Sequence, residues 1–285
     1  MKQRILYSSI ALIFLLGLFF FGKTSVPKPP QADEQVQSIP VFDPLAVIDS
    51  ITNTLSPSQQ MQIQKLKNNM SQGDMEKQQA EQYGELAEFW KDSAAAFVPY
   101  AYYLSQAAKL DNSEKKLTFA AQFILENMRR ESRADLKLWE AQTAAGLFEQ
   151  ALKLNPSNPD LKIGLGSCYV YGEGMIGVGD PQKIVRGIQA LMEVVQKDSN
   201  NMKAQMVLGI ASVISNQTEK GINRLTKVVD FDPHNLEAVS WLADAYADKG
   251  DVANAKKWYE QSKHIVNNPA FSAEVDKRIK ALEQQ

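Results

Sequence analysis

Three glycines with the spacing of a phosphate-binding loop lie between residues 171 and 181. The stretch reads YGEGMIGVGDP, and Gly172, Gly174 and Gly177 match the pattern G-x-G-x-x-G. Such a loop binds the pyrophosphate of a dinucleotide when it follows a β-strand and opens a helix, because its backbone N–H groups then point at the anion. Whether this loop can bind a phosphate therefore depends on the element that precedes Gly172.

The sequence contains no other recognisable arrangement for catalysis or metal binding. His234 and His264 lack the spacing of metal ligands, and Cys168, the single cysteine, has no partner for a disulfide or a thiolate pair. We expect Cys168 to be a small buried hydrophobic residue. The sequence therefore predicts a protein that is not an enzyme, with no cofactor and no metal.

The composition predicts a globular protein without a strong electrostatic field. The chain has 285 residues, of which 44% are hydrophobic and 22% charged, so it can bury a sizeable core. Its 31 Lys and Arg residues nearly balance 33 Asp and Glu residues, for a net charge of -2. Nothing in this balance favours nucleic acid as a partner.

Residues 5–22 predict a membrane anchor. After a short N-terminal flank, residues 1–4, the stretch ILYSSIALIFLLGLFFFG carries no charge over 18 residues, and about 17 to 25 apolar residues cross a bilayer as a helix. The apolar region of a cleaved signal peptide is shorter, and GKTSVPKPP offers no small-x-small cleavage pair. These features favour an uncleaved anchor over a signal peptide.

A Pro- and Gln-rich tether, residues 23–42, follows the predicted anchor. It lacks a helical apolar stripe, so we expect an extended spacer. Lys2 and Arg4 precede the anchor and Lys23 and Lys28 follow it, which tilts slightly toward an exported C-terminal domain. We expect a single-pass protein of the bacterial inner membrane with this domain in the periplasm.

The C-terminal half repeats itself every 34 residues. Leu208, Gly209, Ser212, Gly221, Leu225 and Val228 recur as Leu242, Ala243, Tyr246, Ala255, Tyr259 and Ser262. Their spacings within each set are those of helix faces, so each unit predicts two helices.

The glycine stretch lies in a longer version of this unit. Gly187 precedes Gly221 by 34 residues, but Leu165 precedes Leu208 by 43, so nine extra residues fall between Tyr169 and Gly187. We expect an enlarged turn between two antiparallel helices. Because a helix and not a strand precedes this turn, the dinucleotide interpretation is disfavoured.

Each unit begins with a helix-start signal. Asn158, Asn201 and Asn235 occupy the same offset in LNPSNP, KDSNNM and FDPHNL, where an N-cap is expected. Pro159 then takes the first helical turn, where its missing N–H has no cost.

These residues resemble the tetratricopeptide repeat (TPR) family. The family pattern is an apolar-small pair, a tyrosine, a small residue, an aromatic residue, another small residue and a helix-ending proline. It is matched by Leu165-Gly166, Tyr169, Gly187, Leu191 and Val194, by Leu208-Gly209, Gly221, Leu225 and Pro233, by Leu242-Ala243, Tyr246, Ala255 and Tyr259, and upstream by Ala144, Phe148, Ala151 and Pro156. The sequence departs from the pattern at Ser212, at Ser199 and in the nine-residue insertion.

The resemblance implies an all-α solenoid of helical hairpins wound as a right-handed superhelix. It covers residues 134–269, with clear units at 159–201, 202–235 and 236–269. We interpret residues 43–133 as a divergent helical region and residues 270–285 as a C-terminal capping helix.

In TPR proteins the first helix of each unit lines a concave surface that receives a peptide or a helix. The corresponding second stripe predicts a partner groove that is apolar in its middle and acidic toward the C-terminal end. Its residues are Ile163, Ser167, Val170, Tyr171, Met206, Ile210, Val213, Ile214, Ser240 and Asp244. The alternative is that these residues are covered by the protein's own helices.

The apolar tip of the glycine stretch, Met175 and Ile176, has three open interpretations. It packs against the same protein, contacts a partner, or stays a flexible hairpin whose N–H groups could hold an anion.

The function that this pattern favours is a membrane-anchored, non-catalytic TPR scaffold that binds a polypeptide. Bacterial proteins of this architecture serve envelope protein assembly, secretion or cytochrome maturation. Two alternatives remain: a self-assembling structural subunit, which would form a homo-oligomer, and a small-ligand binder or enzyme that uses the glycine stretch.

Overall fold

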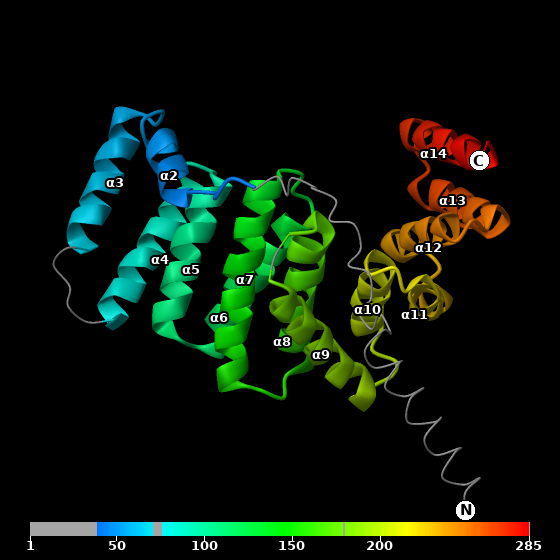
Figure 1. Cartoon of the computed structure of the whole chain (residues 1–285). Helices are drawn as coiled ribbons and strands as arrows, with labels where there is room; N and C mark the ends of the chain where they lie inside the picture. The colour runs from blue at the N-terminus through cyan, green and yellow to red at the C-terminus, as the bar shows by residue number, and fades with distance from the viewer. Residues whose placement is uncertain (1–38, 71–75, 179, 285) are drawn as a thin grey trace, which may run out of the picture. The chain divides into compact units, whose positions relative to one another are not determined.

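The computed structural model describes residues 39–70, 76–178 and 180–284, and every regular element within these ranges is helical (Figure 1). The predicted anchor at 5–22 and most of the predicted tether lie outside the described residues. Among the helices that are described, none is both long and apolar enough to span a bilayer.

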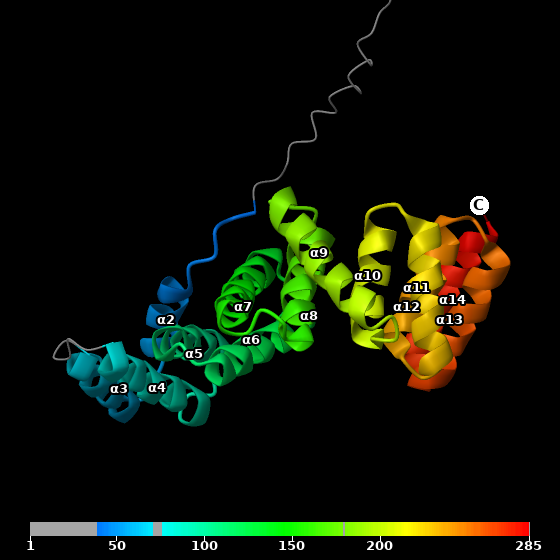
Figure 2. The same cartoon turned by 90° about the horizontal axis from the view of Figure 1, so that it is seen from below.

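The helices follow one another as antiparallel pairs joined by short turns (Figures 1 and 2). In chain order they are α2 (Pro44–Thr52), α3 (Pro57–Met70), α4 (Glu76–Asp92), α5 (Phe97–Asp111), α6 (Glu114–Met128), α7 (Ala134–Leu154), α8 (Pro159–Ser167), η1 (Cys168–Gly174), α9 (Pro181–Lys197), α10 (Met202–Ile214), α11 (Thr218–Phe231), α12 (Leu236–Asp248), α13 (Val252–Val266) and α14 (Pro269–Glu283). The prediction of an all-helical hairpin architecture is confirmed.

The paired helices of the repeats approach each other closely because a glycine faces a leucine. A Cβ atom at Gly166 of α8 would lie 2.5 Å from Leu191 of α9, and one at Gly209 of α10 would lie 2.9 Å from Leu225 of α11. A larger side chain would push the two helices apart. These glycines are the small members of the apolar-small pairs noted in the sequence.

The asparagine N-caps are also confirmed. The side chains of Asn158, Asn201 and Asn235 each accept a hydrogen bond from a backbone N–H in the first turn of the next helix, at 3.0 to 3.1 Å. An N-cap of this kind contributes about 1 kcal/mol. The repeated cap therefore fixes where the first helix of each unit begins.

Residues 43–133 contain α2 to α6, so the divergent region is helical as expected. However, α6 pairs with α7, and the predicted boundary at 133 divides this hairpin. The reason is that α7 carries the family pattern at Ala144, Phe148 and Ala151, whereas its partner α6 does not show it in sequence.

The glycine stretch is a turn only in its second half. Residues Cys168–Gly174 form a π-helix, η1, that continues α8, and α9 begins at Pro181. A Cβ atom at Gly172 would lie 2.3 Å from the Cβ of Ala141, so the glycine lets η1 lie directly on α7. Gly177 has φ of 74°, a left-handed conformation that favours glycine.

Two carboxylates already use the N–H groups that a phosphate would need. The Asp180 side chain accepts from the N–H of Gln182 at 2.8 Å, and Glu173 accepts from the N–H of Asp180 at 3.2 Å. Because acidic groups occupy the start of α9, the turn is not arranged to hold an anion.

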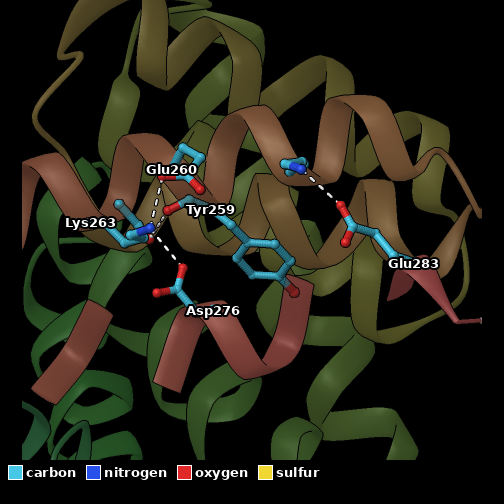
Figure 3. Close-up of polar contacts among 7 residues, drawn as sticks. Tyr259, Glu260, Lys263, Asp276 and Glu283 are labelled. Atoms are coloured by element: carbon cyan, nitrogen blue, oxygen red, sulfur yellow. Dashed lines mark hydrogen bonds and ion pairs between the residues drawn. The ribbon is translucent and has the colours of Figure 1, made fainter. Parts of the chain in front are cut away.

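The predicted C-terminal capping helix corresponds to α14. It buries Val275 and Ile279 against α13. Figure 3 shows the Lys263 ammonium of α13 between Glu260 and Asp276, at 2.9 and 2.7 Å. Such exposed ion pairs each contribute about 0 to 1 kcal/mol, so apolar burial is the larger part of this contact.

Gly→Ala substitutions at and away from the contact between η1 and α7 should change the free energy of unfolding in opposite directions. Gly172→Ala should lower the free energy of unfolding by about 1 to 3 kcal/mol, because the new methyl group overlaps Ala141. Gly146→Ala, in α7 with open space around it, should raise it by about 0.5 to 1 kcal/mol through helix propensity. Urea unfolding followed by circular dichroism measures both. A Gly172→Ala protein at least as stable as the wild type would contradict the packing described here.

Candidate functional site

A groove of about 640 Å³ lies along the first helices of four consecutive hairpins, α6, α8, α10 and α12. We call it the main groove. Each of these helices contacts the next, as Figures 1 and 2 show for the stack. Its apolar lining includes Leu125, Ile163, Met206 and Val207, and its charged lining Glu126, Arg129, Asp160, Lys203, Asp232 and Glu237. The lining of the main groove is therefore mixed, with apolar and charged side chains in similar proportion.

Four of the predicted groove residues line the main groove. They are Ile163 and Ser167 of α8, Tyr171 of η1 and Met206 of α10. The 34-residue period thus brings side chains from successive units to one surface.

Three others belong to the core. Ile210 is fully buried, and Val170 and Val213 are almost so. The helices packed around α10 leave room for only a narrow accessible stripe, so a stripe drawn from helix periodicity alone is too wide. Ile210 and Val170 therefore cannot meet a partner without local unfolding, whereas Val213 is as exposed as Ile163 but does not line the groove.

Asp244, predicted as the acidic end of the groove, does not line it. Asp244 accepts a hydrogen bond from the Tyr259 hydroxyl at 2.6 Å and lies 3.7 Å from Arg278, so it serves the contact of α12 with α13 and α14. Ser240 and Ile214 are partly exposed but do not line the groove. The acidic side chains at the groove are Glu126, Asp160, Asp232 and Glu237.

Phe231 was missed by the sequence analysis. It ends α11, is 74% exposed and lines the main groove. An exposed aromatic residue beside a partly apolar channel is the kind of side chain that anchors a partner. Phe231 begins the stretch FDPHNL at the end of a second helix, outside the first-helix stripe from which the groove was predicted.

A second cavity of about 420 Å³, the side pocket, adjoins the main groove. It is lined by Glu126, Arg129, Arg130, Lys137, Tyr171, Met175, Glu237 and Trp241. Met175, from the tip of the glycine stretch, is 44% exposed at this pocket, whereas the half-buried Ile176 is not part of its lining.

Three residues shared by both cavities form a bridge that we call the clasp. Arg129 at the end of α6 forms an ion pair with Glu237 at the start of α12, 108 residues away. The Arg129 guanidinium also lies 4.9 Å from the centre of the Tyr171 ring, a cation–π contact. Burial, followed by the nearby Glu237, raises the pKa of Tyr171, so its phenol stays neutral. The clasp joins the first and last helices of the groove.

No family model and no curated protein sequence matches this chain. Several solved structures share its helical stacking. They include MamA from Desulfovibrio magneticus RS-1, 22% identical over 68% of this chain and 97% of that one with a TM-score of 0.47. They also include YrrB, a TPR protein with an unusual peptide-binding site, 17% identical over 74% and 97% with a TM-score of 0.45. A third is PilW, a type IV pilus biogenesis factor, 14% identical over 71% and 92% with a TM-score of 0.47. These similarities are too low to transfer a partner or a process to this chain.

The single cysteine is not exposed at the groove. Cys168 is fully buried, and burial raises the pKa of its thiol, which makes it a poor nucleophile. In the part of the chain that the structure describes, no three His, Cys, Asp or Glu side chains are grouped to hold a metal ion.

One buried carboxyl group stands out on α7. Glu140 is fully buried, its Oε1 accepts a hydrogen bond from the Asn127 side chain at 2.6 Å, and its Oε2 has no partner among the described residues. Burial raises its pKa to about 7, against the opposing effect of the Asn127 hydrogen bond; Glu131 adds a smaller increase and Lys137 a smaller decrease. The group is therefore largely protonated below neutral pH.

The raised pKa of Glu140 predicts that the free energy of unfolding falls as the pH rises from about 4.5 to 7. In this range the unfolded chain ionises while the folded protein keeps the proton, so up to about 3 kcal/mol of stability is lost. Glu140→Gln is neutral and keeps the acceptor for Asn127, so it should remove this loss and be more stable than the wild type at about pH 8. Denaturant unfolding across the pH range measures it, with the exposed Glu85→Gln as control. Equal pH dependence in Glu140→Gln and wild type would exclude Glu140 as the source.

Proposed function

We propose that this chain is a non-catalytic scaffold whose main groove binds an extended polypeptide segment of a partner protein. The observation that carries the proposal is the exposed Phe231 beside a channel of mixed apolar and charged lining that runs across four helical hairpins. Stacked repeats present extended surfaces of this kind to peptides. The volume of about 640 Å³ also lies within the usual range of about 300 to 1,000 Å³ for ligand sites.

The lining specifies the chemistry of the segment. The half-buried Leu125 and the exposed Phe231, beside the mostly buried Ile163 and Met206, favour apolar side chains in the segment. On the rim, Arg129 is paired with Glu237, and Lys203 lies 3.8 Å from Asp160. Glu126 and Asp232 form no ion pair with any described residue, so a basic side chain in the segment would complement the rim.

We further propose that residues 5–22 anchor the domain to the inner membrane with the groove in the periplasm. The absence of charge over these 18 residues supports the anchor, and the flanking lysines and arginine give weak support for the orientation. The partner would then be a protein of the cell envelope, the class that includes assembly, secretion and cytochrome-maturation factors.

Site-specific photocrosslinking tests the groove in native cells. Benzoylphenylalanine replaces Phe231 in the groove or Met61 on α3, which is equally exposed at 74% and serves as the matched control. We expect a discrete adduct with another polypeptide from position 231 that is missing from position 61. Adducts between two copies of this chain would support the self-assembling alternative, and adducts from position 61 alone would reject the groove.

The captured segment then provides a quantitative prediction. Phe231→Ala should weaken its binding to the full-length chain about tenfold or more, because a central aromatic anchor contributes about 1 to 3 kcal/mol. Met61→Ala should leave it unchanged. Equal affinities for the two variants, measured by fluorescence anisotropy, would show that Phe231 does not contact the segment.

A further inference from the structure

The two adjoining cavities carry opposite charge. The main groove has four carboxylates and two cations in its lining, whereas the side pocket has two carboxylates and three cations. The cations of the side pocket are Arg129, Arg130 and Lys137. A segment that lies across both cavities therefore meets net negative charge in the main groove and net positive charge in the side pocket.

Two of the three cations are available to a ligand. Arg129 is neutralised by Glu237 in the clasp. Arg130 and Lys137 form no ion pair with any described residue. Of the nearby carboxylates, Glu131 accepts hydrogen bonds from the N–H groups of the next two residues at 2.8 Å, and Asp135 is paired with Arg133. Glu126 lines the same pocket, so two cations face one carboxylate and the pocket keeps a net positive charge.

The wall beside these cations is apolar. Tyr171, Met175 and Trp241 line the side pocket, and they come from η1, the glycine stretch and α12. The pocket thus combines a surface for methylene groups with two unpaired cations, which is the environment that suits a carboxylate on a short aliphatic stem.

We propose that the side pocket binds an acidic side chain of the segment that occupies the main groove. This inference rests on the proposed function and adds the orientation in which the segment is bound. The carboxylate lies between Arg130 and Lys137, and the stem and its neighbour lie on Trp241 and Met175. The basic part of the segment lies at Asp232, which lines the main groove and not the side pocket. The groove therefore selects the order of charges along the bound chain as well as its apolar residues.

The carboxylate is assigned to a side chain and not to a chain terminus. The two cavities share Glu126, Arg129, Tyr171 and Glu237, so they form one continuous surface on which a single segment meets both rims. One segment can place a basic side chain in one cavity and an acidic side chain in the other, and its chain does not have to end in the side pocket.

Two random peptide libraries displayed on phage test the proposal with the full-length chain in detergent. Each peptide has about ten residues, which extend to about 33 Å. One library is fused to the phage at the C-terminus, so its peptides have no free carboxylate at the end. The other library has free C-termini. We expect enrichment from both, with a basic residue toward one end and Asp or Glu toward the other.

Charge reversal of the pocket identifies the site. The variant Arg130→Glu/Lys137→Glu is compared with Lys227→Glu/Lys280→Glu, which makes the same change of charge at exposed positions of α11 and α14. An enriched peptide should bind the pocket variant about tenfold more weakly and the control variant as tightly as the wild type. Replacing the acidic residue of the peptide by Lys should restore its binding to the pocket variant.

Three outcomes of these selections would contradict the proposal in different ways. Enriched peptides without an acidic preference, or with a preference that the pocket variant retains, would overturn the side pocket as a carboxylate site and leave the groove intact. Enrichment from the library with free C-termini alone would show that a chain terminus is bound instead. No enrichment from either library would count against peptide binding itself, and therefore against the proposed function.

Discussion

Close approach of paired helices is the constraint on which the groove depends. At Gly166 and Gly209 the first helix of a hairpin lies so near its partner that no side chain fits between them. This contact sets the distance and rotation of the two helices within each unit. Because the asparagine caps start each first helix at the same point of the repeat, the rotation is reproduced from unit to unit. The same helical face is therefore presented along the stack, and Ile163 and Met206 reach the same surface.

The nine-residue insertion changes this regular pattern at one place. Instead of a loop that projects into solvent, it continues α8 as the π-helix η1 and packs on α7 through Gly172. A π-helical turn rotates the following side chains relative to an α-helix. Tyr171 consequently lies under Arg129 and between the two cavities. The sequence feature that suggested a nucleotide loop thus contributes Tyr171 to the lining of both cavities.

Local signals in the sequence predicted the repeat but not the complete site. The period, the N-caps and the helix before Gly172 depend on residues close in sequence, and all of them are found in the structure. Asp244 could not be placed, because its partners Tyr259 and Arg278 lie on later helices. Arg129 and Glu237 could not be paired either, since 108 residues separate them and α6 lacks the family pattern.

The burial of Ile210 has a related cause. Periodicity shows which side chains share a helix face, but not how many neighbouring helices cover that face. Within the described chain, α10 contacts α8, η1, α9, α11 and α12, so most of its circumference is core. A helix at the end of a stack has fewer neighbours, and the same pattern there would leave a wider accessible stripe. The accessible width of the groove is thus a property of the stack and not of any single unit.

The clasp is a weak contact that joins two helices far apart in the sequence. Arg129 and Glu237 are both partly exposed, and an ion pair of this kind contributes about 0 to 1 kcal/mol. The contact with Tyr171 adds about 0.5 to 1 kcal/mol at such a site. Separating α6 from α12 at this point therefore costs less than the energy that one well-buried side chain of a partner supplies. The clasp therefore adds little to the stability of the stack, whereas the glycine contacts hold the two helices of each hairpin close together.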